Sequence, residues 1–144
     1  MGAAAIWLVM SGALVLGGTK ECSQAEAIAA DKSLEHLNSW LDIQDAFRRF
    51  GYCDHGGVAA GYSDRIMRML SRRWSTVTDL DRLMRPDPKF RAFVLRHIDE
   101  TWVNTEFNRV MDLAATQCPS DAPRICAAIV KRGKEVNDGI AKQH

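Results

Sequence analysis

The spacing of the apolar residues constrains the fold of this chain more than any other feature of its sequence. Apolar positions recur every three or four residues along most of the chain, and no Val/Ile/Thr-rich run alternates with polar residues as a strand would. Asp87 followed by Pro88 is a helix start signal, because aspartate caps free N–H groups and proline fits the first helical position. The pattern predicts an all-α fold.

Six helical segments follow from this spacing, joined by connections of a few residues without a repeat or a long linker. They are about 32–50, about 55–74, about 79–84, a helix from Pro88 to Trp102, one from near Thr105, and one after Pro123. We therefore expect residues 26–144 to form a single helical domain, a compact bundle of five or six short helices stapled by a disulfide.

Some local expectations can be stated for individual residues of these helices. In the first helix, Leu41 shares the apolar face with Leu34, and Gly51 should act as the C-terminal cap. Thr78 should be the N-cap of the third helix. Gly133 is expected to interrupt the last helix, because glycine weakens a helix interior.

The first 25 residues are expected to be an export signal that precedes the domain. Residues 3–18 form an uncharged apolar run, which is short for a membrane span of about 20 residues. Ser23 and Ala25 place small residues at the two positions that signal peptidase reads. No Lys or Arg precedes the apolar run, and a retained anchor is the alternative. A cleaved signal is favoured, so we expect a periplasmic or secreted protein without a membrane span in its mature form.

Export would place the cysteines in an oxidising compartment, where disulfides form. Cleavage near Glu26 would remove Cys22 and leave Cys53, Cys118 and Cys126. Cys118 and Cys126 flank a proline-rich turn, and a bridge between them would staple that corner, with a stabilisation of about 2–3 kcal/mol. Cys53 is then left as a buried inert thiol, an intermolecular bridge, a reactive thiol or a partner for one of the other two.

The balance of charges gives no general reason to bind nucleic acid. The chain has 19 basic and 18 acidic residues, for a formal net charge of +1. One basic face stands out, formed by Arg65, Arg68 and Arg72 and continued by Arg73 at helical spacing. No aromatic residues interleave with it, as a surface for nucleic acid would require. We expect a solvated face paired to acids, or a face that meets an acidic partner.

The stretch FGYCDHGGVAAGYSD, residues 50–64, is the most unusual part of the chain. An aspartate before a helix can cap its free N–H groups, and small residues along a helix let a neighbouring helix approach closely. We therefore expect a capping and packing element first, and a surface for a partner second. The residues singled out for these roles are Asp54, Gly57, Gly61, Tyr62 and Asp64.

Two chemical interpretations of the same stretch remain open. Cys53 and His55, joined by His97, are candidate metal ligands, but adjacent residues point in different directions and no CxxC, HxxxH or HxxE pattern is present. Cys53 would alternatively be a nucleophile with one of the histidines as its base. A disulfide or a buried thiol is favoured in an exported protein. We expect no enzymatic activity, no bound metal and no cofactor.

The run from Cys53 to the Gly-Tyr-Ser-Asp at 61–64, with an export signal and a small helical domain, resembles a known family. These are exported helical immunity proteins, which protect bacteria from peptidoglycan amidases delivered by type VI secretion. The resemblance covers mainly residues 51–64 and the overall layout. It implies a periplasmic, often homodimeric inhibitor that plugs the active-site groove of its effector, and it carries over no binding residues.

One expected function and one alternative follow. The lack of a catalytic constellation favours a protein that binds and inhibits another protein in the periplasm, such as a cell-wall-degrading toxin. The alternative is a periplasmic domain whose cluster of Cys53 and His55 binds a metal or senses the redox state.

Overall fold

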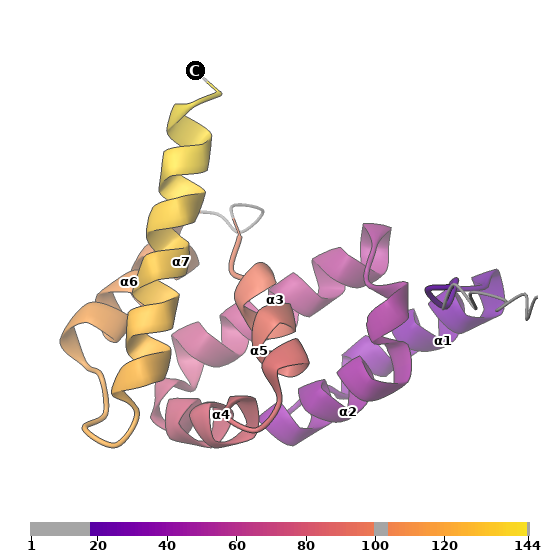
Figure 1. Cartoon of the computed structure of the whole chain (residues 1–144), viewed down its shortest axis with the longest axis horizontal. Helices are drawn as coiled ribbons and strands as arrows, with labels where there is room; N and C mark the ends of the chain where they lie inside the picture. Colours follow the sequence, from indigo (N-terminus) through magenta and orange to yellow (C-terminus); the bar gives the residue numbers. More distant parts are fainter. Residues whose placement is uncertain (1–17, 100–103, 144) are drawn as a thin grey trace, which may run out of the picture.

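The computed structural model of the chain describes residues 18–99 and 104–143 (Figure 1). Within these ranges the chain forms seven α-helices and three short 3-10 turns, without a strand. The helices are α1 (Gln24–Ser33), α2 (Trp40–Phe50), α3 (Gly56–Arg72), α4 (Val77–Met84), α5 (Pro88–Arg96), α6 (Asn104–Thr116) and α7 (Pro123–Ala141); the 3-10 turns are η1 (Leu34–His36), η2 (Gly51–Cys53) and η3 (Trp74–Thr76). The all-α prediction is confirmed, with one helix more than the six segments predicted.

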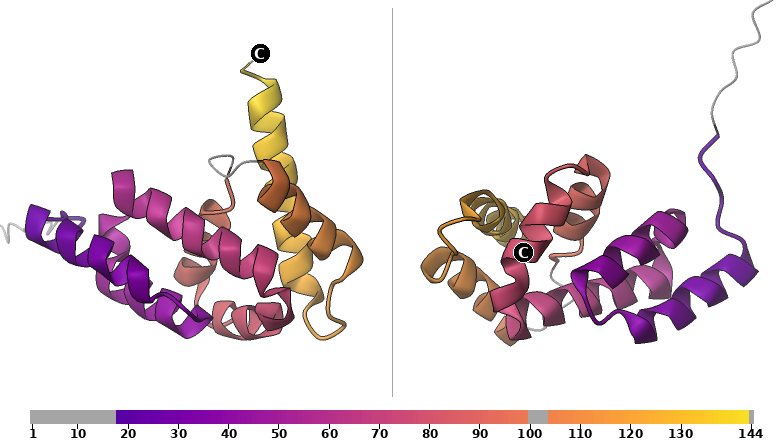
Figure 2. Two further views of the ribbon diagram at one scale, coloured as in Figure 1. Left: turned by 180° about the vertical axis from the view of Figure 1, so that it is seen from behind. Right: turned by 90° about the horizontal axis from the view of Figure 1, so that it is seen from below.

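The long helix α3 connects the two ends of the molecule. Figure 1 shows α1 and α2 at one end and α6 and α7 at the other, and α3 contacts both α1 and α6. The last turns of α7 project beyond the other helices in both figures (Figure 2). One continuous cluster of buried apolar side chains draws residues from all seven helices. None of the helices in the described ranges combines the length and apolar character needed to cross a bilayer.

The N-terminal part of the fold differs from the expected single helix over 32–50. Helix α1 begins at Gln24, inside the segment assigned to the export signal, and η1 separates it from α2. Ser23 and Glu26 form a capping box at the start of α1. Ser39 caps α2 by accepting a hydrogen bond of 3.1 Å from the backbone N–H of Asp42. The break between α1 and α2 could not be predicted, because the apolar spacing continues without interruption across residues 34–41.

The cysteine pairing confirms one expectation and corrects another. Cys118 and Cys126 form the predicted disulfide, with Cα atoms 5.9 Å apart. Cys53 is not left over, because it pairs with Cys22, at a Cα distance of 5.0 Å. Cleavage near Glu26 would remove Cys22 and break this bridge. Cleavage that preserves this bridge must therefore occur before Cys22.

Glycines at two positions allow close contacts between helices. A Cβ atom at Gly61 would overlap with the Leu34 side chain of η1, and one at Gly133 would overlap with the Met111 side chain of α6. The predicted packing role of Gly61 is confirmed. Helix α7 continues through Gly133, so the predicted interruption there is wrong. The buried glycine instead lets α6 and α7 approach.

Substituting Gly61 by leucine should destabilise the protein by about 1–3 kcal/mol, because the new side chain must displace Leu34 from a packed core. The matched control is Gly57→Ala on the same helix. A Cβ at Gly57 meets nothing within 4 Å, so this change should leave stability unchanged or raise it by up to about 1 kcal/mol. Urea unfolding measures both. Equal unfolding midpoints for the two variants would contradict the packing role.

The predicted helix ends are partly confirmed. Asp87 caps α5, where its carboxylate accepts a hydrogen bond of 2.9 Å from the backbone N–H of Phe90. Thr78 is not the N-cap of α4, because the helix begins one residue earlier, at Val77. The Thr78 hydroxyl donates a hydrogen bond to Asp121 instead. Gly51 is the C-cap of α2, as predicted, and its backbone N–H donates to the Phe47 carbonyl; its backbone is right-handed and continues into η2.

Two expectations involve residues outside the described ranges. These residues are Trp102, expected at the end of the fourth helix, and all but the last residue of the apolar run at 3–18. The helix itself, α5, ends at Arg96. The expected export signal therefore stays a prediction.

Candidate functional site

Asp54 joins the start of α3 to the end of α5 and does not cap α3. The N-cap residue is His55, whose side chain makes no capping hydrogen bond. The Asp54 carboxylate instead accepts hydrogen bonds from Arg96 and His97. The Nε2 atom of His97 lies 3.1 Å from both carboxylate oxygens. The sequence could not reveal these partners, because they lie more than forty residues further along the chain.

His97 connects Asp54 to a buried serine of α3. The residue is only 3% exposed, and its Nδ1 atom lies 2.9 Å from the Ser63 hydroxyl oxygen on α3. The Ser63 hydroxyl also lies 3.0 Å from Oδ2 of Asp99, to which it donates. Asp54, His97, Ser63 and Asp99 thus form a continuous polar chain. A cavity of about 290 Å³ opens beside it, with small residues such as Ala60 in its wall.

The ionisation of Asp54 depends on this chain. Burial alone would raise the pKa of Asp54, but the hydrogen bonds and charges of His97 and Arg96 outweigh burial and lower the pKa below its ordinary value. Asp54 is therefore held as a carboxylate. Its ionised form stabilises the contact between α3 and α5.

The combination of Ser63, His97 and Asp54 has the residue types of a catalytic triad, but its geometry favours a structural role. Ser63 is 2% exposed and lies in the middle of α3, where backbone N–H groups are bonded within the helix. An oxyanion would need such N–H groups free. The nucleophile proposed from the sequence, Cys53, has its sulfur bonded to Cys22. The expected lack of enzymatic activity stays a prediction.

The three candidate metal ligands are not assembled into a site. The sulfur of Cys53 is in a disulfide, His55 is exposed, and His97 is bonded to Asp54 and Ser63. Within the described ranges, no group of three or more His, Cys, Asp or Glu side chains is placed to hold a metal ion.

The remaining residues singled out in the stretch 50–64 take different positions. Gly57 is exposed at the start of α3, and Tyr62 is fully buried, with its hydroxyl donating to the Ala46 carbonyl at 3.4 Å. Asp64 accepts a hydrogen bond of 2.7 Å from Arg68, one turn further along α3. Most of these residues therefore serve packing and charge pairing within the fold.

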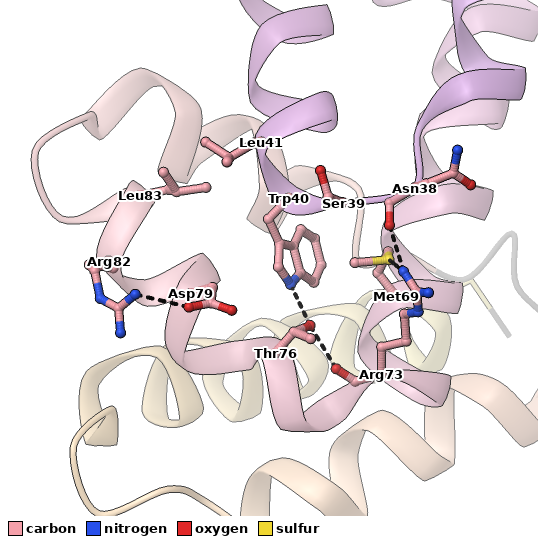
Figure 3. Close-up of a pocket in the computed structure, with 10 residues that line it drawn as sticks. All are labelled: Asn38, Ser39, Trp40, Leu41, Met69, Arg73, Thr76, Asp79, Arg82 and Leu83. Carbon is pink, nitrogen blue, oxygen red and sulfur yellow. Dashed lines mark hydrogen bonds and ion pairs between the residues drawn. The ribbon is translucent and has the colours of Figure 1, made fainter.

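A groove with an apolar floor lies where α2 meets α3 and α4 (Figure 3). Its cavity measures about 240 Å³. Trp40 forms part of the lining and is only 3% exposed; its indole N–H donates to the Thr76 hydroxyl at 2.9 Å. Leu41 and Leu83 lie on one side of the groove in Figure 3. Leu41 is 64% exposed, although the sequence placed it on a buried helix face.

The opposite side of the groove is polar. Arg73 donates a hydrogen bond of 2.6 Å to the Asn38 backbone carbonyl and lies against Met69 (Figure 3). A second cavity of about 170 Å³ continues from these three residues along α3. The basic face predicted from the sequence lines this cavity with Arg65, Arg68 and Arg72.

The arginines of the basic face differ in their partners. Arg68 pairs with Asp64, and Arg72 pairs with Glu106 of α6 at 2.9 Å. Arg65 and Arg73 have no carboxylate partner among the residues that the structure describes. The expected solvated face paired to acids is therefore only partly realised, and two guanidinium groups remain for other partners.

The groove was missed by the sequence reasoning, because Trp40, Leu41 and Leu83 all fit the apolar stripes of amphipathic helices. A helical period shows which residues share a face, but not whether another helix covers that face. The only signal in the sequence was the neighbouring row of arginines.

Comparison of the chain with protein-family models, with curated proteins and with solved structures finds no match. The resemblance to exported immunity proteins therefore rests on residues 51–64 and the layout of the chain.

Proposed function

We propose that the protein is an exported helical protein that binds and inhibits another protein. The observation that carries this proposal is the groove beside Leu41. A leucine that is 64% exposed at the edge of an apolar cavity loses contact with water when a partner packs against it, which favours binding. The neighbouring arginines can then orient the partner.

The disulfides support the compartment in this proposal. Two bridges, Cys22–Cys53 and Cys118–Cys126, join the described cysteines in pairs. Such bonds form and persist in the periplasm or outside the cell. They fit a periplasmic or secreted protein, which would meet its partner in the same compartment.

The resemblance of residues 51–64 to immunity proteins suggests the class of partner. A peptidoglycan amidase delivered by type VI secretion would be the target, and the protein would block its active-site groove. The homodimer implied by the resemblance belongs to the same proposal.

The proposal predicts that a gene beside that of this protein encodes a peptidoglycan amidase, and the test uses that amidase. The purified, disulfide-bonded protein should inhibit hydrolysis of peptidoglycan in proportion to its amount, until one chain is present per enzyme. A lysozyme, which cleaves the sugar backbone instead, serves as the control enzyme and should stay active. Full amidase activity in excess protein, with no complex in size-exclusion chromatography, would disprove this function.

The alternative function, a metal or redox site at Cys53 and His55, has less support. Metal binding through Cys53 would require reduction of its bond to Cys22. His55 is exposed and Cys53 is completely buried, so the two side chains do not share a ligand cavity.

A further inference from the structure

We infer that the groove beside Leu41 and the basic face of α3 form one continuous binding surface. The surface fits a protein segment that carries an apolar side chain next to carboxylates. This inference rests on the proposed binding function and specifies the chemistry of the partner.

The continuity of the surface follows from the residues that line it. The apolar cavity and the basic cavity share Asn38, Met69 and Arg73. A ligand that fills the first cavity therefore reaches the arginines of the second without leaving the surface. Arg73 stands at the junction, on the side of the groove opposite Leu41 (Figure 3).

The charge of this surface favours an acidic partner. Its lining includes five arginines but only one acid; the charged residues are Arg65, Arg68, Arg72, Arg73, Arg82 and Asp79. Arg82 pairs with Asp79, and two further arginines pair with acids outside the lining. Two guanidinium groups, those of Arg65 and Arg73, are left without a carboxylate in the described ranges. Carboxylates of a partner would accept charge-assisted hydrogen bonds from these two guanidinium groups.

Arg73 is also held ready for such a partner. A guanidinium has five N–H donors, and the contacts of Arg73 with described residues use only Nη1. Its backbone carbonyl accepts a hydrogen bond of 2.7 Å from the Thr76 hydroxyl. The contacts of Nη1 with Asn38 and Met69 restrict the side chain before a ligand arrives, so less conformational entropy is lost on binding.

The apolar end of the surface favours a protein segment over a nucleic acid. Binding of single strands relies on exposed aromatic faces on which bases stack. Trp40, the aromatic residue in this groove, is almost completely buried and directs its N–H to Thr76. The exposed group is the aliphatic side chain of Leu41, which suits an apolar side chain of a protein.

The test uses short synthetic peptides and the full disulfide-bonded protein labelled with ¹⁵N. The first peptide has a Leu-Phe pair flanked by glutamates. The second has lysines in place of the glutamates, and the third has Ser-Gly in place of Leu-Phe. The first peptide should shift the Trp40 indole and Leu41 amide signals, and the other two should bind at least about tenfold more weakly. Binding of the first should also weaken as salt is raised.

Variants of the protein locate the binding surface. Arg65→Gln with Arg73→Gln should weaken binding of the first peptide at least about tenfold. Arg91→Gln, which changes an exposed arginine of α5, should not alter it. Leu41→Ser should weaken binding, whereas Ile28→Ser, at a residue of α1 that is 51% exposed, should not. Thermal unfolding of each variant shows that the fold is retained.

Several results would overturn the inference. They are equal binding of the three peptides, no binding of the first, shifts centred away from Trp40 and Leu41, or tighter binding of a DNA oligonucleotide at the same residues. The peptide experiment and the amidase experiment can fail independently of each other. Amidase inhibition that survives the groove changes would leave the function intact on another surface. Specific peptide binding without inhibition of the amidase would support the surface and refute the inhibitor.

Discussion

Removal of the Cys22–Cys53 bridge should lower the free energy of unfolding by about 4 kcal/mol. The bridge joins residues 31 positions apart, so its loss restores much conformational freedom to the unfolded chain. It also ties the start of α1 to the turn before α3. Cys118–Cys126 spans only 8 positions, and the same chain-entropy relation predicts about 2.5 kcal/mol for its loss.

The comparison needs two double variants, Cys22→Ser with Cys53→Ala, and the matched control Cys118→Ser with Cys126→Ala. Urea unfolding should place the first variant below the second in stability. Thiol titration of the parent should detect no free thiol until it is unfolded and reduced. An intact mass showing that the exported protein begins after Cys22 would contradict the pairing, as would equal stability of the first variant and the parent.

Asp54→Ala should lower the free energy of unfolding by about 2–3 kcal/mol. The change removes the acceptor for the buried His97 and for Arg96, and a buried donor left without a partner is costly. The cap role expected from the sequence would predict only about 1 kcal/mol. The control is Asp64→Ala, which removes the exposed pair with Arg68 and should cost less than about 1 kcal/mol.

The effect of Asp54 should depend on pH in a defined direction. Because the folded protein lowers the pKa of Asp54, the ionised carboxylate favours the folded state. Its contribution is complete above the unfolded pKa of about 3.9 and is lost as the pH falls through the folded pKa. The difference in melting temperature between parent and Asp54→Ala should therefore shrink below about pH 4. A difference that stays constant from neutral to acidic pH would show that the charge is not involved.

Local chemistry determined the helical class and several helix boundaries of this protein. Asp87 and Pro88 start α5 through a cap and a preset backbone angle, which depend only on neighbouring residues. The short loop between Cys118 and Cys126 holds its cysteines close in any helical fold, so their pairing was also predictable. Gly61 was predicted to allow close packing because its neighbours share one apolar face.

The tertiary structure alone decided how distant segments meet. Cys22 forms a disulfide with Cys53, and Asp54 forms a hydrogen bond with His97, only because α1 and α5 pack at the start of α3. The exposure of Leu41 was decided in the same way, since a helical period defines an apolar face but not the element that covers it. These contacts join residues far apart in sequence, and their energies depend on the burial and geometry that the whole fold creates.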